Sequence, residues 1–336
     1  MYESARLRSI DIARGIGILS IIAGHFGIPA IVRVVFTFHI PVFYLITGYF
    51  MKEEAVPLFL RKKAETLLLP YMITCMAVVV LQGITALFNS RRVAGTLWIW
   101  IKAGFYGAGS SYHLPESFTP IGAVWFLWAT FWGSLLMQIV LRRNQVMQAV
   151  WTAVLFAFGY LTAHKFLWLP FDIQPGCCAV LYMYAGYIAG KNEDRIKKWV
   201  KKAWPAAFFV WFAFIYTFTS FALVRCDYGK GAIDIAASLG AAHCIFFLSE
   251  MLDRAGGRTA DVLDHIGRCS LVILCVHLVE MDLVDWWAVV DRFQMIGIPR
   301  LAGCCAAVGM KMVTIFGGTL MVTGLGKMIR KKTESR

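Results

Sequence analysis

Long apolar stretches recur along the whole sequence. A helix needs about 20 mostly apolar residues to cross the roughly 30 Å hydrocarbon core of a bilayer. Stretches of this kind have centres near Ile18, Phe43, Val78, Trp128, Leu155, Met183, Phe214, Ala241, Leu274 and Ile315. They are continuous, unlike the short alternating segments of a membrane β-barrel. The sequence therefore predicts an all-α polytopic membrane protein, a bundle of about ten transmembrane helices.

The composition excludes a soluble protein. Hydrophobic residues make up 59% of the chain, charged residues only 16%, and the mean hydropathy is +0.65, whereas a globular chain is about a quarter charged. Because no hydrophilic run is long enough to fold alone, we expect residues 1–336 to form one integral-membrane domain. The nine cysteines mostly lie in apolar stretches without CxxC spacing, which favours core packing over a metal site or disulfide framework.

The net charge of +13 is best explained by membrane topology. With the N-terminus in the cytoplasm, about 22 Lys and Arg lie inside and about nine outside, as the positive-inside rule favours. We therefore expect both termini to be cytoplasmic, in a multi-pass protein of a cell membrane such as the bacterial plasma membrane. The basic loops would face anionic lipids or an anionic cytoplasmic ligand, and no nucleic-acid partner is expected.

The segment Ser9–Phe50 places ionisable residues at membrane depth, namely Asp11, Arg14, His25 and His39. A charged side chain there costs at least about 2.5 kcal/mol, so a functional interpretation is the default. Arg14 and His25 are eleven residues apart, which puts them on one helix face about 16 Å apart. Asp11 can pair with Arg14. On these residues alone, a structural ion pair and a satisfied buried histidine remain open alternatives.

A short turn follows His25. Gly24, Gly27 and Pro29 tighten the chain there, so the next span returns antiparallel. We expect His39 on that span to approach the same cavity as His25.

Several motifs follow in a fixed order. They are Arg14 and His25 with ten residues between them, Phe38-His39-x-Pro41-x-Phe43, Gly48, Phe59-Leu60-Arg61-Lys62-Lys63, Leu69-Pro70-Tyr71, Trp125-Phe126-Leu127, Gly267-x-x-Ser270-Leu271 and His277. Together they resemble the acyltransferase-3 family of integral-membrane acyltransferases, over nearly the full length. The resemblance implies a ten-helix fold, an acyl-CoA donor on the cytoplasmic side, and O-acylation of a carbohydrate or similar acceptor, often on the outer side.

Carried over residue by residue, the resemblance makes His25 the catalytic histidine and Arg14 its essential partner, with Asp11 beside it. An imidazole suits this role, because a hydroxyl needs a base near neutrality to attack a thioester. Arg14 does not deprotonate and is better suited to clamp an anion or a carbonyl. The sequence leaves open which ring nitrogen of His25 acts.

The same resemblance assigns donor binding to Arg61, Lys62, Lys63 and Tyr71. The three basic residues form a compact patch suited to coenzyme A phosphates, and Tyr71 would lie near the pantetheine path. Family members commonly carry a further Arg where this chain has Glu65-Thr66. Alternatively, the basic patch only reflects the excess of positive charge in cytoplasmic loops, and Tyr71 is a tyrosine at the membrane interface.

Acceptor-binding candidates are expected toward the outer side. Trp125 and Phe126 follow a predicted loop from about Asn89 to Pro120 and could stack on sugar rings or form a membrane belt. His277 and Glu280 share a helix face. Glu280 could orient a histidine or accept an acceptor hydroxyl, although a solvated outer helix end is the simpler interpretation. His39 completes this substrate-binding set.

Three functions remain possible from the sequence. The first is a membrane O-acyltransferase that moves an acyl group, expected to be acetyl, from cytoplasmic acyl-CoA to a hydroxyl of a cell-envelope carbohydrate or small glycoside. The second is a proton-coupled secondary transporter that uses the intramembrane Asp, Arg and His residues. The third is a membrane sensor or scaffold. Acyl-CoA, the acceptor and membrane lipids are the expected partners, no metal is expected, and the oligomeric state is open.

Overall fold

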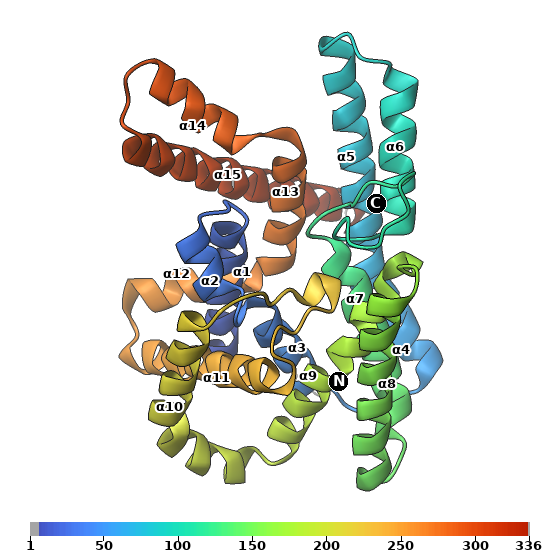
Figure 1. Cartoon of the computed structure of the whole chain (residues 1–336), viewed down its shortest axis with the longest axis vertical. Coiled ribbons are helices and arrows are strands. Elements are labelled where there is room, and N and C mark those ends of the chain that lie inside the picture. Colours follow the sequence, from blue (N-terminus) through green and yellow to red (C-terminus); the bar gives the residue numbers. More distant parts are fainter. Residues whose placement is uncertain (1–6, 335–336) are drawn as a thin grey trace.

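The computed structural model describes the backbone of residues 7–334, and their side chains except those of residues 194–201 and 329–334. Both termini, which we expected in the cytoplasm, lie outside the described residues. Within the described part the chain is helical, with one isolated bridge between Ala222 and Asp227. Figure 1 shows the helices α1 (Arg8–Gly24), α2 (Pro29–Val35), α3 (His39–Tyr49), α4 (Val56–Lys63), α5 (Leu69–Phe88), α6 (Val93–Tyr106), α7 (Trp125–Leu141), α8 (Gln145–Lys165), α9 (Ile173–Lys191), α10 (Glu193–Tyr216), α11 (Ala232–Ala255), α12 (Gly257–Arg268), α13 (Ser270–Leu283), α14 (Trp286–Met295) and α15 (Arg300–Glu334).

Each of the ten predicted span centres lies in a helix, but fewer helices have the length and apolarity of a membrane span. In the described residues, five qualify: Pro29–Tyr49, Val56–Phe88, Gln145–Lys165, Ala232–Ala255 and Arg300–Met328. The pair α12 and α13, bent by 72° at their junction, would be a sixth. Helix α1 falls short because it has only 17 residues. Helix α9 has 19 residues, but its polar and tyrosine side chains make it less apolar than a span requires. The count of about ten spans therefore stays a prediction.

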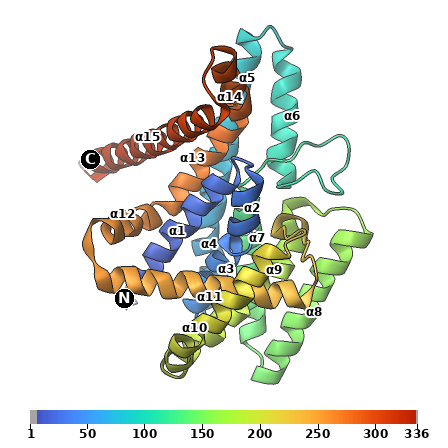
Figure 2. The same ribbon diagram turned by 60° about the vertical axis from the view of Figure 1, so that its left-hand side comes forward.

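The predicted loop between Asn89 and Pro120 is wrong in its first half, where α6 forms. The segment Val93–Tyr106 is a 14-residue apolar run without proline that packs on α5. Gly107, with a φ of +83°, ends the helix in the left-handed conformation that glycine adopts readily. In Figures 1 and 2, α5 and α6 form a hairpin beside α13, α14 and α15, and α5 packs on α13.

Glycine residues allow two pairs of central helices to pack with their backbones in direct contact. A Cβ added to Gly48 of α3 would lie 1.8 Å from the Met183 carbonyl oxygen of α9. A Cβ added to Gly267 of α12 would lie 1.8 Å from the Asp11 carbonyl oxygen of α1. Small residues allow this close approach between membrane helices. Both glycines belong to the motifs identified in the sequence, and their role here is to fix α1 and α3 at the centre of the fold.

The end of α1 meets the last three helices. Trp287 on α14 donates a hydrogen bond to the Phe26 carbonyl oxygen, at 3.0 Å, just beyond α1. Helix α14 packs on α15, and α15 packs on α13. This arrangement brings segments from both ends of the chain together around His25.

Candidate active site

His25 directly follows α1, where its backbone is still helical, with a φ of −73°. Its Nδ1 atom lies 3.1 Å from Nε2 of His277 on α13. The two ring centroids are 5.3 Å apart. A residue expected to bind substrate therefore lies in direct hydrogen-bond contact with the predicted catalytic histidine.

His277 in turn contacts Glu280, three residues along α13. The Nδ1 atom of His277 is 3.1 Å from Oε2 of Glu280. His277 is fully buried and Glu280 is 4% exposed. The simpler interpretation of Glu280, as part of a solvated helix end, was wrong because α14 and α15 cover its carboxylate.

Two residues that the sequence interpretation missed hold that carboxylate. The Nζ atom of Lys311 on α15 lies 2.9 Å from Oε2 and 3.1 Å from Oε1 of Glu280. Trp286 Nε1 also donates to Oε1. Lys311 is 2% exposed. Its position inside an apolar stretch was the available signal, since a buried lysine in a membrane helix needs a partner.

These contacts determine which nitrogen of His25 is free. Glu280, paired with Lys311, is a carboxylate and only accepts hydrogen bonds, so Nδ1 of His277 carries a proton. A second buried cation beside Lys311 is disfavoured, which leaves Nε2 of His277 as an acceptor. Nδ1 of His25 then donates to it. The free lone pair of His25 lies on Nε2, the nitrogen suited to act as a base.

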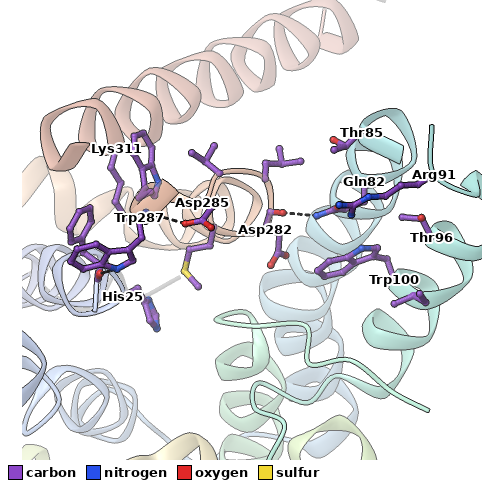
Figure 3. A pocket seen from close by; sticks show the side chains of 16 residues that line it. His25, Gln82, Thr85, Arg91, Thr96, Trp100, Asp282, Asp285, Trp287 and Lys311 are labelled. Carbon is purple, nitrogen blue, oxygen red and sulfur yellow. Dashed lines mark hydrogen bonds between the residues drawn. The ribbon is translucent and has the colours of Figure 1, made fainter. Parts of the chain in front are cut away.

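His25 lines a cavity of about 740 Å³ between the α5–α6 hairpin and α13, α14 and α15. Figure 3 shows His25, Trp287 and Lys311 on one side of it and Gln82, Arg91, Thr96 and Trp100 on the other. Asp282 and Asp285 also line it. Charged residues, hydroxyl and amide groups, and aromatic rings thus surround the approach to His25.

A second, smaller cavity of about 60 Å³ also reaches His25. His39, Trp125 and Phe126 line it, so the structure brings three of the predicted substrate-binding residues to the catalytic histidine. The Nδ1 atom of His39 lies 2.9 Å from the Val35 carbonyl oxygen, to which it donates. Phe126 stacks on Tyr44 with ring centroids 5.2 Å apart.

Arg14 pairs with Asp11, as the sequence predicted, with Nη1 at 2.9 Å from Oδ1. The Arg14 side chain is 35% exposed and that of Asp11 is 5% exposed. Because α1 is unbroken, Arg14 and His25 lie on one helix face about 16 Å apart. Neither member of the ion pair lines the two cavities at His25.

The expected donor-binding residues lie elsewhere. Arg61 pairs with Glu65 at 2.9 Å, Lys62 pairs with Glu54 at 2.8 Å, and Lys63 lies over the Phe59 ring. Arg61 and Lys62 are exposed and Lys63 is half-buried, and two of these three charges have carboxylate partners.

Tyr71 is buried between α5 and α6. Its hydroxyl donates to the Gly104 carbonyl oxygen at 2.6 Å, so it fastens these helices together. At 3% exposure, its ring does not face the surface of the protein. Among the described residues, no group of three or more His, Cys, Asp or Glu side chains could hold a metal ion.

Comparison with known proteins identifies the family. The acyltransferase-3 family model, described as an acyltransferase domain, matches residues 7–321. No curated protein and no solved structure matches the chain. The family match gives no support to the transporter interpretation. Since the match covers nearly the whole chain and the structure contains several apolar helices of spanning length, the chain belongs to the acyltransferase-3 family and is a multi-pass membrane acyltransferase.

Proposed function

We propose that this protein transfers an acyl group from cytoplasmic acyl-CoA to a hydroxyl of a cell-envelope carbohydrate or small glycoside, in the plasma membrane of a bacterium. The observation that carries this proposal is the position of His25. It lies at the junction of a 740 Å³ cavity and a 60 Å³ cavity, with Nδ1 bonded to a buried His277–Glu280 pair. This arrangement leaves one imidazole nitrogen available to a reacting hydroxyl.

In the proposed reaction, Nε2 of His25 takes the proton of the acceptor hydroxyl. The hydroxyl oxygen attacks the thioester carbonyl carbon, the C–S bond breaks, and an ester forms. His25 then returns the proton to the departing thiolate, which leaves as free coenzyme A. Such general base and acid catalysis contributes about 10²- to 10⁴-fold in rate. His277 and Glu280 act here by fixing the tautomer of His25, in place of the substrate contacts expected for them.

The larger cavity suits the acceptor. Sugar hydroxyls require hydrogen-bond partners when they leave water, and Gln82, Thr96 and Asp282 supply them along the cavity wall. Trp100 offers an aromatic face. With the N-terminus in the cytoplasm, as proposed from charge, the seventeen residues of α1 place His25 about 25 Å toward the outer side, where an envelope acceptor is available.

The donor is proposed to bind on the opposite side. Arg14, held by Asp11, keeps a third of its surface exposed and can contact an anionic or carbonyl group of the donor. The patch Arg61, Lys62 and Lys63 would attract the phosphates electrostatically. Because Arg61 and Lys62 are already paired, we assign the patch a role in donor capture rather than in tight binding.

The test is thioester turnover by purified protein in lipid nanodiscs. Acetyl-CoA and an envelope glycan fraction are supplied, and free thiol release is measured together with the glycan mass. We expect thiol release that depends on the acceptor, and a mass increase of one acyl group on the glycan. Absence of both with every acceptor fraction, from protein shown to be folded, would contradict the proposal.

A further inference from the structure

The small cavity beside His25 has walls from distant parts of the chain. Ile21 of α1, Ile40 of α3 and Leu274 of α13 contribute, each less than 10% exposed. The segment from Phe221 to Val224, between α10 and α11, closes another side. Because His25 belongs to the lining of both cavities, a group bound in the small one lies next to the same imidazole that the large one approaches.

The two cavities differ in chemistry. The described residues that line the small cavity include no Asp, Glu, Lys or Arg, and its polar side chains are the two histidines and the Trp125 indole. The Nδ1 atom of His39 is already used by the Val35 carbonyl oxygen. By contrast, Arg91, Asp282 and Asp285 line the large cavity. An apolar chain gains free energy from the small cavity, whereas a hydroxylated molecule would lose hydrogen bonds there.

The size of the small cavity sets a limit on its occupant. One water-sized group occupies about 10–15 Å³ of such a volume, so 60 Å³ holds about four to six groups. An acetyl group has three non-hydrogen atoms and a butyryl group has five. An octanoyl group has nine, so part of its chain would extend beyond this volume.

We propose that this small cavity is the acyl pocket, which binds the chain of the transferred group and restricts the donor to short acyl thioesters. This inference rests on the proposed function and names its donor class. The acyl chain lies between Ile40 and Leu274, with its carbonyl carbon beside His25, while the acceptor hydroxyl approaches from the large cavity. Trp125 and Phe126 then serve as walls of the acyl pocket, not as a stacking surface for sugar.

The test measures kcat/KM by free thiol release with acetyl-, propionyl-, butyryl- and octanoyl-CoA at a fixed acceptor concentration. A single methylene changes such discrimination by about 10- to 200-fold in a tight pocket. We therefore expect octanoyl-CoA to be at least about 100-fold poorer than acetyl-CoA. Equal use of acetyl and octanoyl donors would overturn the acyl pocket, because a cavity of this volume encloses an acetyl group but not a whole octanoyl chain.

Two variants alter the pocket in opposite directions. Leu274→Ala removes side-chain volume from one wall and should lower the acetyl-to-octanoyl ratio at least about tenfold. Ala123→Val enlarges a side chain that lines the pocket and so narrows it. It should lower kcat/KM for propionyl- and butyryl-CoA relative to acetyl-CoA. The control is Leu141→Ala on α7, because Leu141 has the same 6% exposure as Leu274 but lines neither cavity. It should leave the donor ratios unchanged.

The outcomes separate this inference from the proposed function. If no thioester is consumed by the wild-type protein, the acyltransferase mechanism fails. If acetyl-CoA is consumed but Leu274→Ala and Leu141→Ala share the wild-type donor ratios, only the acyl pocket fails. Should Leu274→Ala not fold, Ile40→Val deletes one methyl group from another lining residue of the same cavity, and the same comparison of donor ratios applies.

Discussion

The imidazole rings of His25 and His277 are joined by a hydrogen bond between Nδ1 of His25 and Nε2 of His277, at 3.1 Å, across 252 residues of sequence. Through this contact, the Glu280–Lys311 pair fixes the position of the proton on His277 and thereby on the proposed catalytic base. It turns a histidine that could exist in either tautomer into one whose Nε2 is free.

Replacement of His277 by Ala tests this control of the tautomer. His25 would then lose the acceptor for its Nδ1 proton, and we expect kcat to fall by about 10²- to 10⁴-fold. The KM for acyl-CoA should change little, because His277 is fully buried and lines neither cavity. Steady-state kinetics with acetyl-CoA separates the two parameters, and an unchanged kcat with a raised KM would assign His277 to substrate binding instead.

The buried pair of Lys311 and Glu280 should contribute strongly to stability. Lys311→Met leaves the buried Glu280 carboxylate without its opposite charge, which costs about 3–5 kcal/mol. The double variant Glu280→Gln with Lys311→Met removes both charges and should regain much of this loss. Thermal unfolding in detergent measures both variants. Equal destabilisation of the single and double variants would show that the side chains matter here for packing and not for charge.

The close contact of α12 with α1 predicts a different stability effect. Gly267→Ala places a methyl group 1.8 Å from the Asp11 carbonyl oxygen, so the helices must separate at a cost of about 1–3 kcal/mol or more. The matched control is Gly309→Ala on α15, where an added Cβ meets nothing within 4 Å. It should be neutral or slightly stabilising, because Ala favours helix. Similar melting temperatures for both variants would contradict this account of the packing.

Arg14→Lys separates a structural ion pair from a donor clamp. A lysine can keep the contact with Asp11 but lacks the planar fork of the guanidinium. We expect near-wild-type stability and a loss of acyl transfer of about ten- to a hundredfold, as for one charge-assisted hydrogen bond. Full activity with lysine would confine Arg14 to the ion pair.

Local sequence patterns predicted part of this site. The eleven-residue spacing placed Arg14 and His25 on one helix, and the antiparallel return placed His39 near His25, because both follow from helix periodicity and a short turn. The hydrogen bond between His25 and His277 was beyond such patterns, since it depends on how α13 packs on α1. Lys311 and Trp286 come from α15 and α14, and the last apolar stretch was interpreted only as a membrane span.

For the fold too, local features could be predicted from the sequence and helix packing could not. Apolar runs located the helices, yet hydropathy does not reveal which of them lie in the interior of the protein. Helix α1 accommodates Asp11 and Arg14 because it packs against other helices, α11 and α12 among them, where the two side chains pair. Helix α6 was missed because its apolar run is short. The close helix contacts at Gly48 and Gly267 have no periodic signature, although both glycines were part of the motifs that identified the family.

The most direct test of the central claim is acyl transfer by His25→Ala. The variant protein, shown by thermal unfolding to be folded, is compared with the wild type for acceptor-dependent thiol release from acetyl-CoA. If Nε2 of His25 is the base, transfer should fall by at least about 10²-fold, while acetyl-CoA binding measured without acceptor is kept. Transfer at the wild-type rate by folded His25→Ala protein would contradict the mechanism.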